Sequence, residues 1–224
     1  MYQAKPITEG IEVSESVVKF EDENCIVYYN FWGENGDIGF TIYNKNVENL
    51  YLHLDECFYV ENGFAYDYYQ NRVNTISTIV AGIMSVEKKI ICIPSRCSKH
   101  ISEFNINKQL YRNCDMPLYP GKKDNNTLRF TMEDSPFVFG NRLAYSIGDA
   151  GAIIRVNNDF YISKISNYAL ENITRTVQKE NCGKKSYQTD IVFINSGPDQ
   201  FYIEYYYDIR YDNNTNNPMY YERY

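Results

Sequence analysis

The sequence predicts an all-β protein, an immunoglobulin-like antiparallel β-sandwich with one short helix and an apolar insertion between strands. Two Asn-Gly dipeptides, Asn35-Gly36 and Asn62-Gly63, lie between segments of alternating apolar and polar residues, and Asn-Gly is the strongest short-range signal for a β-hairpin. Aromatic residues make up 16% of the chain, which suits strands better than helical bundles. Many short strand-like segments separated by turn residues favour a sandwich. A partly closed barrel is the alternative architecture.

The length of the chain, 224 residues, is enough for one domain with a full core. We expect residues 1–209 to form a single β-sandwich domain. Residues 210–224 are rich in Asn and Tyr, and the sequence predicts a disordered tail there. Tyrosines are frequent across residues 205–221, so the alternative is an ordered tail that contacts a partner through Tyr220 and Tyr221.

The first Asn-Gly dipeptide predicts a specific hairpin. A short strand over residues 16–20 precedes two strands that each carry one apolar face. If Asn35-Gly36 is a two-residue loop, Phe31 lies opposite Phe40 and Tyr29 lies opposite Ile42. The two apolar faces then coincide, as the register of a half-buried hairpin requires. The residues of these faces are Cys25, Val27, Tyr29 and Phe31 on one strand and Ile38, Phe40 and Ile42 on the other.

The second Asn-Gly dipeptide predicts an aromatic face. A strand over residues 50–54 precedes it, and a two-residue loop at Asn62-Gly63 pairs Tyr59 with Tyr66 and Cys57 with Tyr68. We expect this face to lie at the solvent side or at a contact. Tyr59, Tyr66 and Tyr68 are therefore candidate interaction residues.

Residues 73–86 form an uncharged apolar segment. Their aliphatic residues follow helical spacing, which predicts a short helix or loop that covers one end of the sandwich. The functional alternative is an apolar insertion that docks on a partner or on another copy. On that hypothesis Ile79 and Ile83 belong to the interaction surface.

The rest of the chain continues the alternation of strands and turns. Asn157-Asn158-Asp159 predicts a turn, Asn167 predicts the start of a helix over residues 170–179, and Cys182-Gly183 predicts its end. Residues 107–127 predict a long loop. The further predicted strands are 89–93, 98–106, 128–132, 143–147, 152–156, 160–165, 190–194 and 200–209.

Charge is unevenly distributed along the chain. The net charge of −7 argues against a nucleic-acid partner. Residues 1–69 hold 13 acidic and 3 basic side chains, whereas residues 88–123 hold 8 basic and 2 acidic ones. Mutual neutralisation within one fold, head-to-tail contact between copies and a basic patch for anionic ligands are the three interpretations.

No catalytic or cofactor motif is present. The chain has two histidines, His53 and His100, and six cysteines. The best metal candidate is a tetrahedral zinc site, but the cysteine spacing lacks the tight Cys-x2-Cys pair of most zinc ribbons. The alternatives for these cysteines are a disulfide across Pro94-Ser95 and free thiols. We therefore predict no enzyme activity, no cofactor and no metal. The residues of the zinc candidate are Cys92, Cys97, His100 and Cys114.

Four stretches of the chain resemble an uncharacterised family of Bacteroidetes proteins. They are residues 21–32, residues 36–72, residues 90–94 with 98–106, and residues 181–185. Many members carry a lipoprotein signal before a Tyr-rich β-domain. The resemblance implies an envelope protein. This sequence lacks the signal and the lipid-bearing Cys, which we expect either of a trimmed protein or of a relative from a phage or mobile element.

These observations predict a non-enzymatic binding or structural module of the cell envelope. The alternative is a structural subunit of a large assembly such as a phage virion. Either function implies a protein partner or self-association, with no nucleic acid, and membrane association only through a lipid anchor that this sequence does not contain. No apolar run is long enough to span a membrane. The expected location is the cell envelope if an upstream signal has been removed, and otherwise a virion or the cytoplasm.

Overall fold

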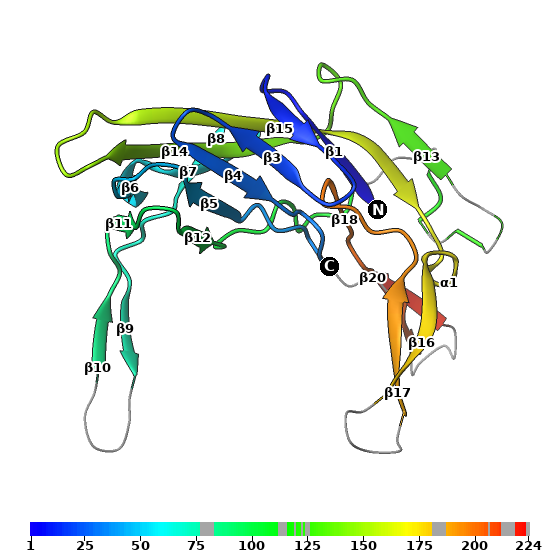
Figure 1. Cartoon of the computed structure of the whole chain (residues 1–224). Helices are drawn as coiled ribbons and strands as arrows, with labels where there is room; N and C mark the ends of the chain where they lie inside the picture. The colour runs from blue at the N-terminus through cyan, green and yellow to red at the C-terminus, as the bar shows by residue number, and fades with distance from the viewer. Residues whose placement is uncertain are drawn as a thin grey trace.

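The regular secondary structure of the described residues is almost entirely antiparallel β-strand (Figure 1). A computed structural model describes residues 1–76, 83–111, 116–118, 120–121, 123, 126–180, 187–205, 207–211 and 218–222. The all-β, antiparallel class that the sequence predicts is therefore confirmed. Two main sheets lie one above the other, and two-stranded hairpins extend from them.

The larger sheet contains nine strands among the described residues, in the order β11-β6-β14-β15-β1-β18, with β7, β8 and β13 beside this path. The central pair, β14 and β15, runs in continuous register from Val138↔Tyr161 to Tyr145↔Ile154. The strands are β1 (Tyr2–Pro6), β6 (Leu50–His53), β7 (Phe58–Glu61), β8 (Phe64–Asp67), β11 (Ile90–Ile93), β13 (Asn126–Arg129), β14 (Val138–Ile147), β15 (Ile154–Asn167) and β18 (Gln200–Phe201).

The smaller sheet contains five strands in the order β12-β5-β4-β3-β2. Sequential hairpins build most of it, because β2 pairs with β3, β3 with β4 and β4 with β5. β12 then joins the far edge of β5 after the chain has passed through the larger sheet. The strands are β2 (Ile11–Val13), β3 (Val18–Glu21), β4 (Cys25–Tyr29), β5 (Phe40–Asn44) and β12 (Ser98–Ile101).

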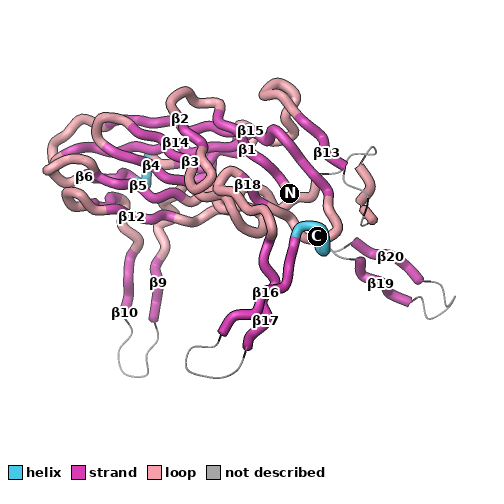
Figure 2. Tube along the Cα trace, turned by 45° about the vertical axis from the view of Figure 1, so that its right-hand side comes forward, coloured by secondary structure: helices cyan, strands magenta, loops and turns pink. Residues whose placement is uncertain are grey.

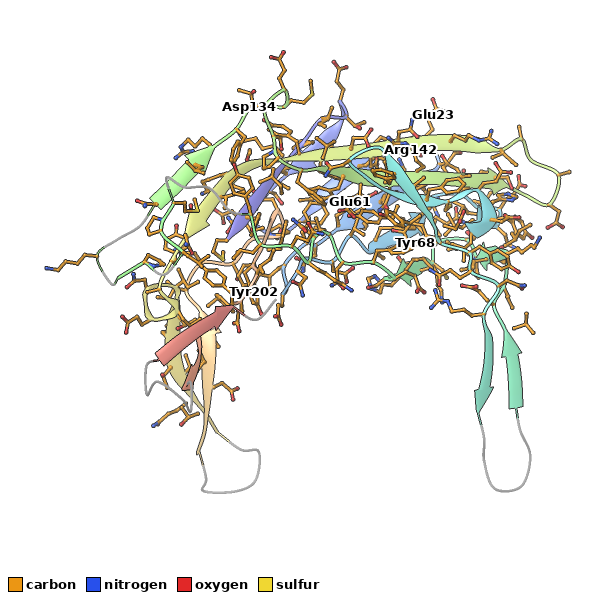
Figure 3. The ribbon with its side chains drawn as sticks, turned by 180° about the vertical axis from the view of Figure 1, so that it is seen from behind. Glu23, Glu61, Tyr68, Asp134, Arg142 and Tyr202 are labelled. Carbon is orange, nitrogen blue, oxygen red and sulfur yellow. The ribbon has the colours of Figure 1, made fainter. Side chains whose placement is uncertain are left out.

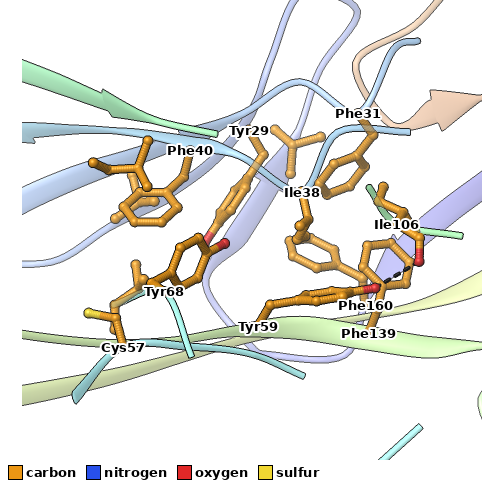
Figure 4. Close-up of a cluster of buried hydrophobic side chains, with 14 of the residues drawn as sticks. Tyr29, Phe31, Ile38, Phe40, Cys57, Tyr59, Tyr68, Ile106, Phe139 and Phe160 are labelled. Carbon is orange, nitrogen blue, oxygen red and sulfur yellow. Dashed lines mark hydrogen bonds between the residues drawn. The ribbon is translucent and has the colours of Figure 1, made fainter. Parts of the chain in front are cut away.

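Aromatic rings fill the space between the two sheets (Figure 4). The Tyr29 ring of β4 meets the Phe160 ring of β15 edge-on, with centroids 5.4 Å apart. Phe31 meets Phe139 of β14 in the same way at 5.5 Å. Edge-to-face pairs of this kind add about 1 kcal/mol each to the burial of their apolar area. The core is thus a contact between the inner faces of the two sheets.

The register predicted around the first Asn-Gly dipeptide is wrong by two residues. Tyr29 pairs with Phe40, and Val27 pairs with Ile42. Residues 30–39 form a connection that is itself buried in places, because Phe31 and Ile38 are fully buried. A shift of two residues keeps every side chain on its own face, so the apolar faces coincide as predicted although their partners differ.

The second Asn-Gly dipeptide forms the predicted hairpin. Tyr59 pairs with Tyr66, and the Tyr68 amide donates to the Cys57 carbonyl at 3.1 Å. Asn62 and Gly63 both have positive φ, 45° and 86°, as a two-residue hairpin turn of type I′ requires. The pairing prediction is confirmed here.

Within residues 73–86, the described residues 73–76 and 83–86 form strands instead of the predicted helix or loop. β9 (Val73–Ile76) and β10 (Ile83–Val86) pair antiparallel, with Val73 opposite Val86 and Ile76 opposite Ile83. Both strands contain β-branched residues at high density, which favours strand over helix. The hairpin, here called the β9–β10 arm, extends away from the two sheets (Figures 1 and 2).

Two predictions within and just after β15 are wrong. The predicted turn at residues 157–159 is instead the middle of β15, because Asn158 is buried and its amide donates to the Tyr29 hydroxyl at 2.8 Å. The predicted helix over residues 170–179 is limited to α1 (Leu170–Ile173), and β16 (Thr174–Glu180) follows directly. The Asn167 amide donates to the Leu118 carbonyl at 3.1 Å, so it does not cap the helix, and Ala169 stands at that position.

Two further hairpins complete the chain. β16 pairs with β17 (Tyr187–Phe193) in the β16–β17 arm, which extends from the same side of the sheets as the β9–β10 arm but from the opposite end (Figure 1). β19 (Tyr207–Tyr211) pairs with β20 (Pro218–Glu222). Residues 210–211 and 218–222 of the predicted disordered tail are therefore paired strand, and the tyrosines among them favour strands.

Candidate interaction surfaces

The predicted tyrosine face is mostly inside the molecule, so that prediction is wrong for two of its three residues. Tyr59 and Tyr68 are 2% and 1% exposed. The Tyr59 hydroxyl donates to the Ile106 carbonyl at 2.7 Å, as Figure 4 shows. The Tyr68 hydroxyl donates to the Asn141 Oδ1 at 2.8 Å, and Figure 3 shows Tyr68 within the body. Alternation places these rings on one face of the hairpin, and this face turns toward the smaller sheet.

Burial fixes the protonation of these two hydroxyls. Desolvation raises the pKa of Tyr59, and the nearby Glu61 carboxylate raises it further. Desolvation likewise raises the pKa of Tyr68 well above its usual value. Both groups therefore remain neutral hydrogen-bond donors at ordinary pH, which is the structural role of a buried tyrosine.

The exposed part of the β7–β8 hairpin is its last strand. Tyr66 is 43% exposed, and its ring stacks on Tyr59 with centroids 5.8 Å apart. Phe64, beside the turn, is 70% exposed. Alternation places Phe64 on the same face as Tyr66, so this signal could have identified it. This strand offers a small aromatic surface.

The β9–β10 arm is the second predicted surface. Ile83 begins β10 opposite Ile76, whereas Ile79 lies outside the described residues. The base of the arm is fixed by Arg72, whose guanidinium lies 2.5 Å from Glu103 and 3.8 Å from Glu87. The arm is therefore held at its base and extends from it.

Tyr220 and Tyr221 lie on β20, opposite Ile209 and Asp208 of β19. Their backbone is paired with another strand of the same chain. The surface contributed by their side chains lies outside what the structure describes.

An apolar cavity that the sequence did not predict lies at the end of the larger sheet from which the β16–β17 arm extends. Its volume is about 560 Å³, which falls in the range of small-molecule sites. It lies between the N-terminal strand, the end of β15, helix α1 and the loop around residues 110–120. Described residues that line it include Tyr2, Met116, Leu118, Ile165, Leu170 and Ile173.

Few polar groups lie around this cavity. The Tyr205 hydroxyl bonds to the Leu118 carbonyl and to Asn167. The Tyr2 hydroxyl accepts the Tyr111 amide at 2.9 Å, and burial raises the pKa of Tyr2 to about 12. These two hydroxyls bond to other protein groups, and the apolar part of the lining can hold an apolar group.

The cysteine and histidine candidates for zinc do not gather in the described residues. Cys92 and Cys97 are free, exposed thiols, and they flank the short segment that crosses from β11 in one sheet to β12 in the other. The His100 Nδ1 lies 3.0 Å from the Thr41 hydroxyl, and Cys114 lies outside the described residues. Within the part of the chain that the structure describes, no three His, Cys, Asp or Glu side chains form a metal-binding group.

No helix among the described residues has the length and apolar character to cross a membrane. Comparison with protein-family models, with curated proteins and with solved structures finds no match. The function is therefore argued from the surfaces of this chain alone.

Proposed function

We propose that this protein is a non-enzymatic structural subunit of a larger protein assembly, such as a virion, which binds neighbouring chains through its projecting hairpins. The observation that carries the proposal is the pair of two-stranded arms on one side of the body (Figures 1 and 2). A module of the cell envelope that binds a protein partner is the alternative setting.

Projecting hairpins favour a role in assembly for a physical reason. An isolated two-stranded hairpin is at best marginally stable in water, and hairpins gain stability by packing against other elements. The β9–β10 arm contains no charged residue over residues 73–86, and Val86 is 57% exposed. A partner chain that covers the arm would bury these apolar residues and stabilise the hairpin.

The burial of two tyrosines shifts the balance between the two hypotheses. The envelope hypothesis relied on a tyrosine surface that binds a protein or glycan, and the structure places Tyr59 and Tyr68 in the core. The assembly hypothesis relied on an apolar insertion and on segregated charge, and neither depends on those residues. We therefore rank assembly first.

An immunoglobulin-like classification of the two-sheet core is part of the same proposal. Its support is that the sheets face each other and that the chain changes sheet between β5 and β6 and again between β11 and β12, as Greek-key sandwiches do. An experimental structure with a different strand connectivity would contradict it.

The experiment compares two valines in the organism that carries the gene. The tagged chain is expressed there, and the mass of the complexes that contain it is measured by size-exclusion chromatography with light scattering. We expect a complex much larger than the monomer. Val86→Glu, on the arm, should remove most of the chain from the large complex, whereas Val47→Glu, at an 81% exposed valine of the body, should not.

A tagged chain that elutes only as a monomer would contradict the proposal. Equal effects of the two valine substitutions would locate the contact away from the arm. Electron microscopy of the isolated complex then distinguishes a virion from an envelope assembly.

A second candidate function is the binding of an apolar small molecule, which the 560 Å³ cavity favours. Native mass spectrometry of the purified chain should then show an added mass of an acyl or aromatic compound. Ile173→Arg, which places a charge in the cavity wall, should remove it. A chain that carries no added mass after incubation with a fatty acid would contradict this second function.

A further inference from the structure

We propose that copies of this chain join edge to edge, with strand β2 of one copy pairing with strand β12 of the next to extend the five-stranded sheet. This inference rests on the proposed structural function and names the partner, a second copy, and the contact. It uses the two outer strands of the smaller sheet, which stand at opposite ends of the order β12-β5-β4-β3-β2.

The first free edge is β12. Among the described residues it pairs only with β5, and Ser98, Lys99 and His100 are exposed. The Asn44 amide donates to the Cys97 carbonyl at 3.0 Å. Because hydrogen-bonded and non-bonded pairs alternate along antiparallel strands, the backbone N–H and C=O groups of Ser98 and His100 point away from β5. They are available to another strand.

The second free edge is β2. It pairs only with β3 in the described part of the chain, and Glu12 and Val13 are exposed. The Ser14 amide donates to the Val17 carbonyl at 2.9 Å. By the same alternation the backbone groups of Ile11 and Val13 point away from β3. Unpaired strand edges are the usual sites of strand addition.

The two edges carry opposite charge. Glu9, Glu12 and Glu15 lie exposed along β2 and its flanks. At β12 and in the turn that precedes it, Arg96 and Lys99 are exposed cations.

Opposite charge selects which edges meet. Pairing of β12 with another β12, or of β2 with another β2, would place like charges together, and such contacts cost several kcal/mol. Pairing of β2 with β12 brings the acidic edge that carries Glu12 beside the edge that carries Arg96 and Lys99. A contact between two different surfaces of identical chains is head-to-tail, and it repeats into a ring or filament. That geometry suits a subunit of a large assembly.

One cross-strand row shows how the sheet would continue. On the outer face, Glu12 pairs with Lys19, Lys19 with Tyr28, Tyr28 with Thr41, and Thr41 with His100. The Glu12 carboxylate already lies 3.1 Å from the Lys19 amine. The row therefore begins with Glu12 at one edge and ends with His100 at the other, so a second copy in the same orientation would continue it with its own Glu12.

The experiment uses two complementary variants of the full chain. In variant A the acidic edge is reversed by Glu12→Lys and Glu15→Lys, and in variant B the basic edge is reversed by Lys99→Glu and His100→Glu. Sedimentation velocity of the purified wild type should show concentration-dependent oligomers that weaken with added salt. Each variant alone should associate at least about tenfold more weakly, and an equimolar mixture of A and B should recover the wild-type oligomers.

Two controls separate strand pairing from other causes. Lys5→Glu with Glu133→Lys changes exposed charges away from both edges and should leave association unchanged. Ser98→Pro removes an outward N–H while leaving the charges intact, and it should also abolish association, because the new strand loses a ladder hydrogen bond. Circular dichroism of each variant checks that it is folded.

A purified wild type that stays monomeric at every concentration would overturn edge pairing, as would variants that associate as well as the wild type. Either result leaves the proposed function intact if the chain still enters a large complex in its host. Conversely, a chain that is monomeric in its host contradicts the proposed function even if the purified protein associates.

Discussion

The two Asn-Gly dipeptides have the same local backbone and build different structures. Asn35 and Gly36 have φ values of 63° and 68°, and Asn62 and Gly63 have values of 45° and 86°. The second dipeptide closes a two-residue hairpin, whereas the first lies in the connection of residues 30–39 between β4 and β5. Asn-Gly therefore determines the left-handed conformation at two positions, and the surrounding core determines which residues pair.

Contacts with distant segments explain the first case. The Asn35 amide donates to the Tyr202 carbonyl at 2.7 Å, and the Ile106 amide donates to the Gly36 carbonyl at 3.1 Å. Phe31 and Ile38 on either side are fully buried. Closing the hairpin at the dipeptide would place Phe31 opposite Phe40 and give up the contacts with residues 106 and 202. At the second dipeptide Asn62 bonds to Val138 of β14, but no residue packs against Gly63, because nothing lies within 4 Å of a Cβ added there.

The largest test of this comparison removes an aromatic ring from each connection. Phe31→Ala should lower the free energy of unfolding by about 4 kcal/mol, because it leaves a large cavity between the sheets. Phe64→Ala, beside the second turn and 70% exposed, should change it by less than about 0.5 kcal/mol. Urea unfolding followed by circular dichroism measures both. Similar losses at the two positions would mean that residues 30–39 are not part of the core.

The second test adds one methyl group to each turn. A Cβ at Gly36 would lie 2.8 Å from the Ile106 Cδ1 and 2.9 Å from the Phe201 Cγ. Gly36→Ala therefore combines overpacking with an unfavourable φ, and we expect a loss of about 3 kcal/mol. Gly63→Ala adds only the unfavourable φ, so it should lower the free energy of unfolding by about 1 kcal/mol. Equal melting temperatures for the two variants would contradict this difference.

Much of the fold follows from the sequence because alternation is a local signal. The apolar faces of β4, β5 and β6 and the pairing of Tyr59 with Tyr66 were predicted from residues close in the chain. The long strand β15 was not predicted, because asparagine, the residue at position 158, is typical of turns. It is held in the strand by the Tyr29 hydroxyl, whose position becomes known only when the sheets meet.

The interaction surfaces were harder to predict for a related reason. Alternation shows that Tyr59 and Tyr68 share a face, but it does not show which face turns inward. The charged edges of the smaller sheet were visible only as charge imbalance along the chain. These charges lie at free edges only because β2 and β12 are the outer strands of the sheet. The position of β12 in turn follows from a connection that crosses between the two sheets.

The third test uses alkaline pH to examine the second hairpin. Burial raises the pKa of Tyr59 and of Tyr68, whereas tyrosine in the unfolded chain has a pKa of about 10. The stabilisation from this difference is complete below pH 10 and is lost as the pH rises above it, by about 1.4 kcal/mol per pH unit for each buried tyrosine. Tyr59→Phe should flatten the fall in stability between about pH 10 and 11. An unchanged slope in urea unfolding across that range would show that Tyr59 ionises freely in the folded protein.

The smallest expected effect separates backbone from side chain at the second turn. The Asn62 side chain accepts the Val138 amide at 2.9 Å, and the Asn62 amide donates to the Val138 carbonyl at 2.8 Å. Asn62→Ala loses the side-chain acceptor and strains the positive φ, so it should cost about 1 kcal/mol. Asn62→Gly loses the acceptor but keeps the backbone relaxed, so it should cost less. If the two variants unfold at the same urea concentration, the bond to β14 rather than the turn conformation stabilises this hairpin, and the second dipeptide then depends on tertiary contacts as the first one does.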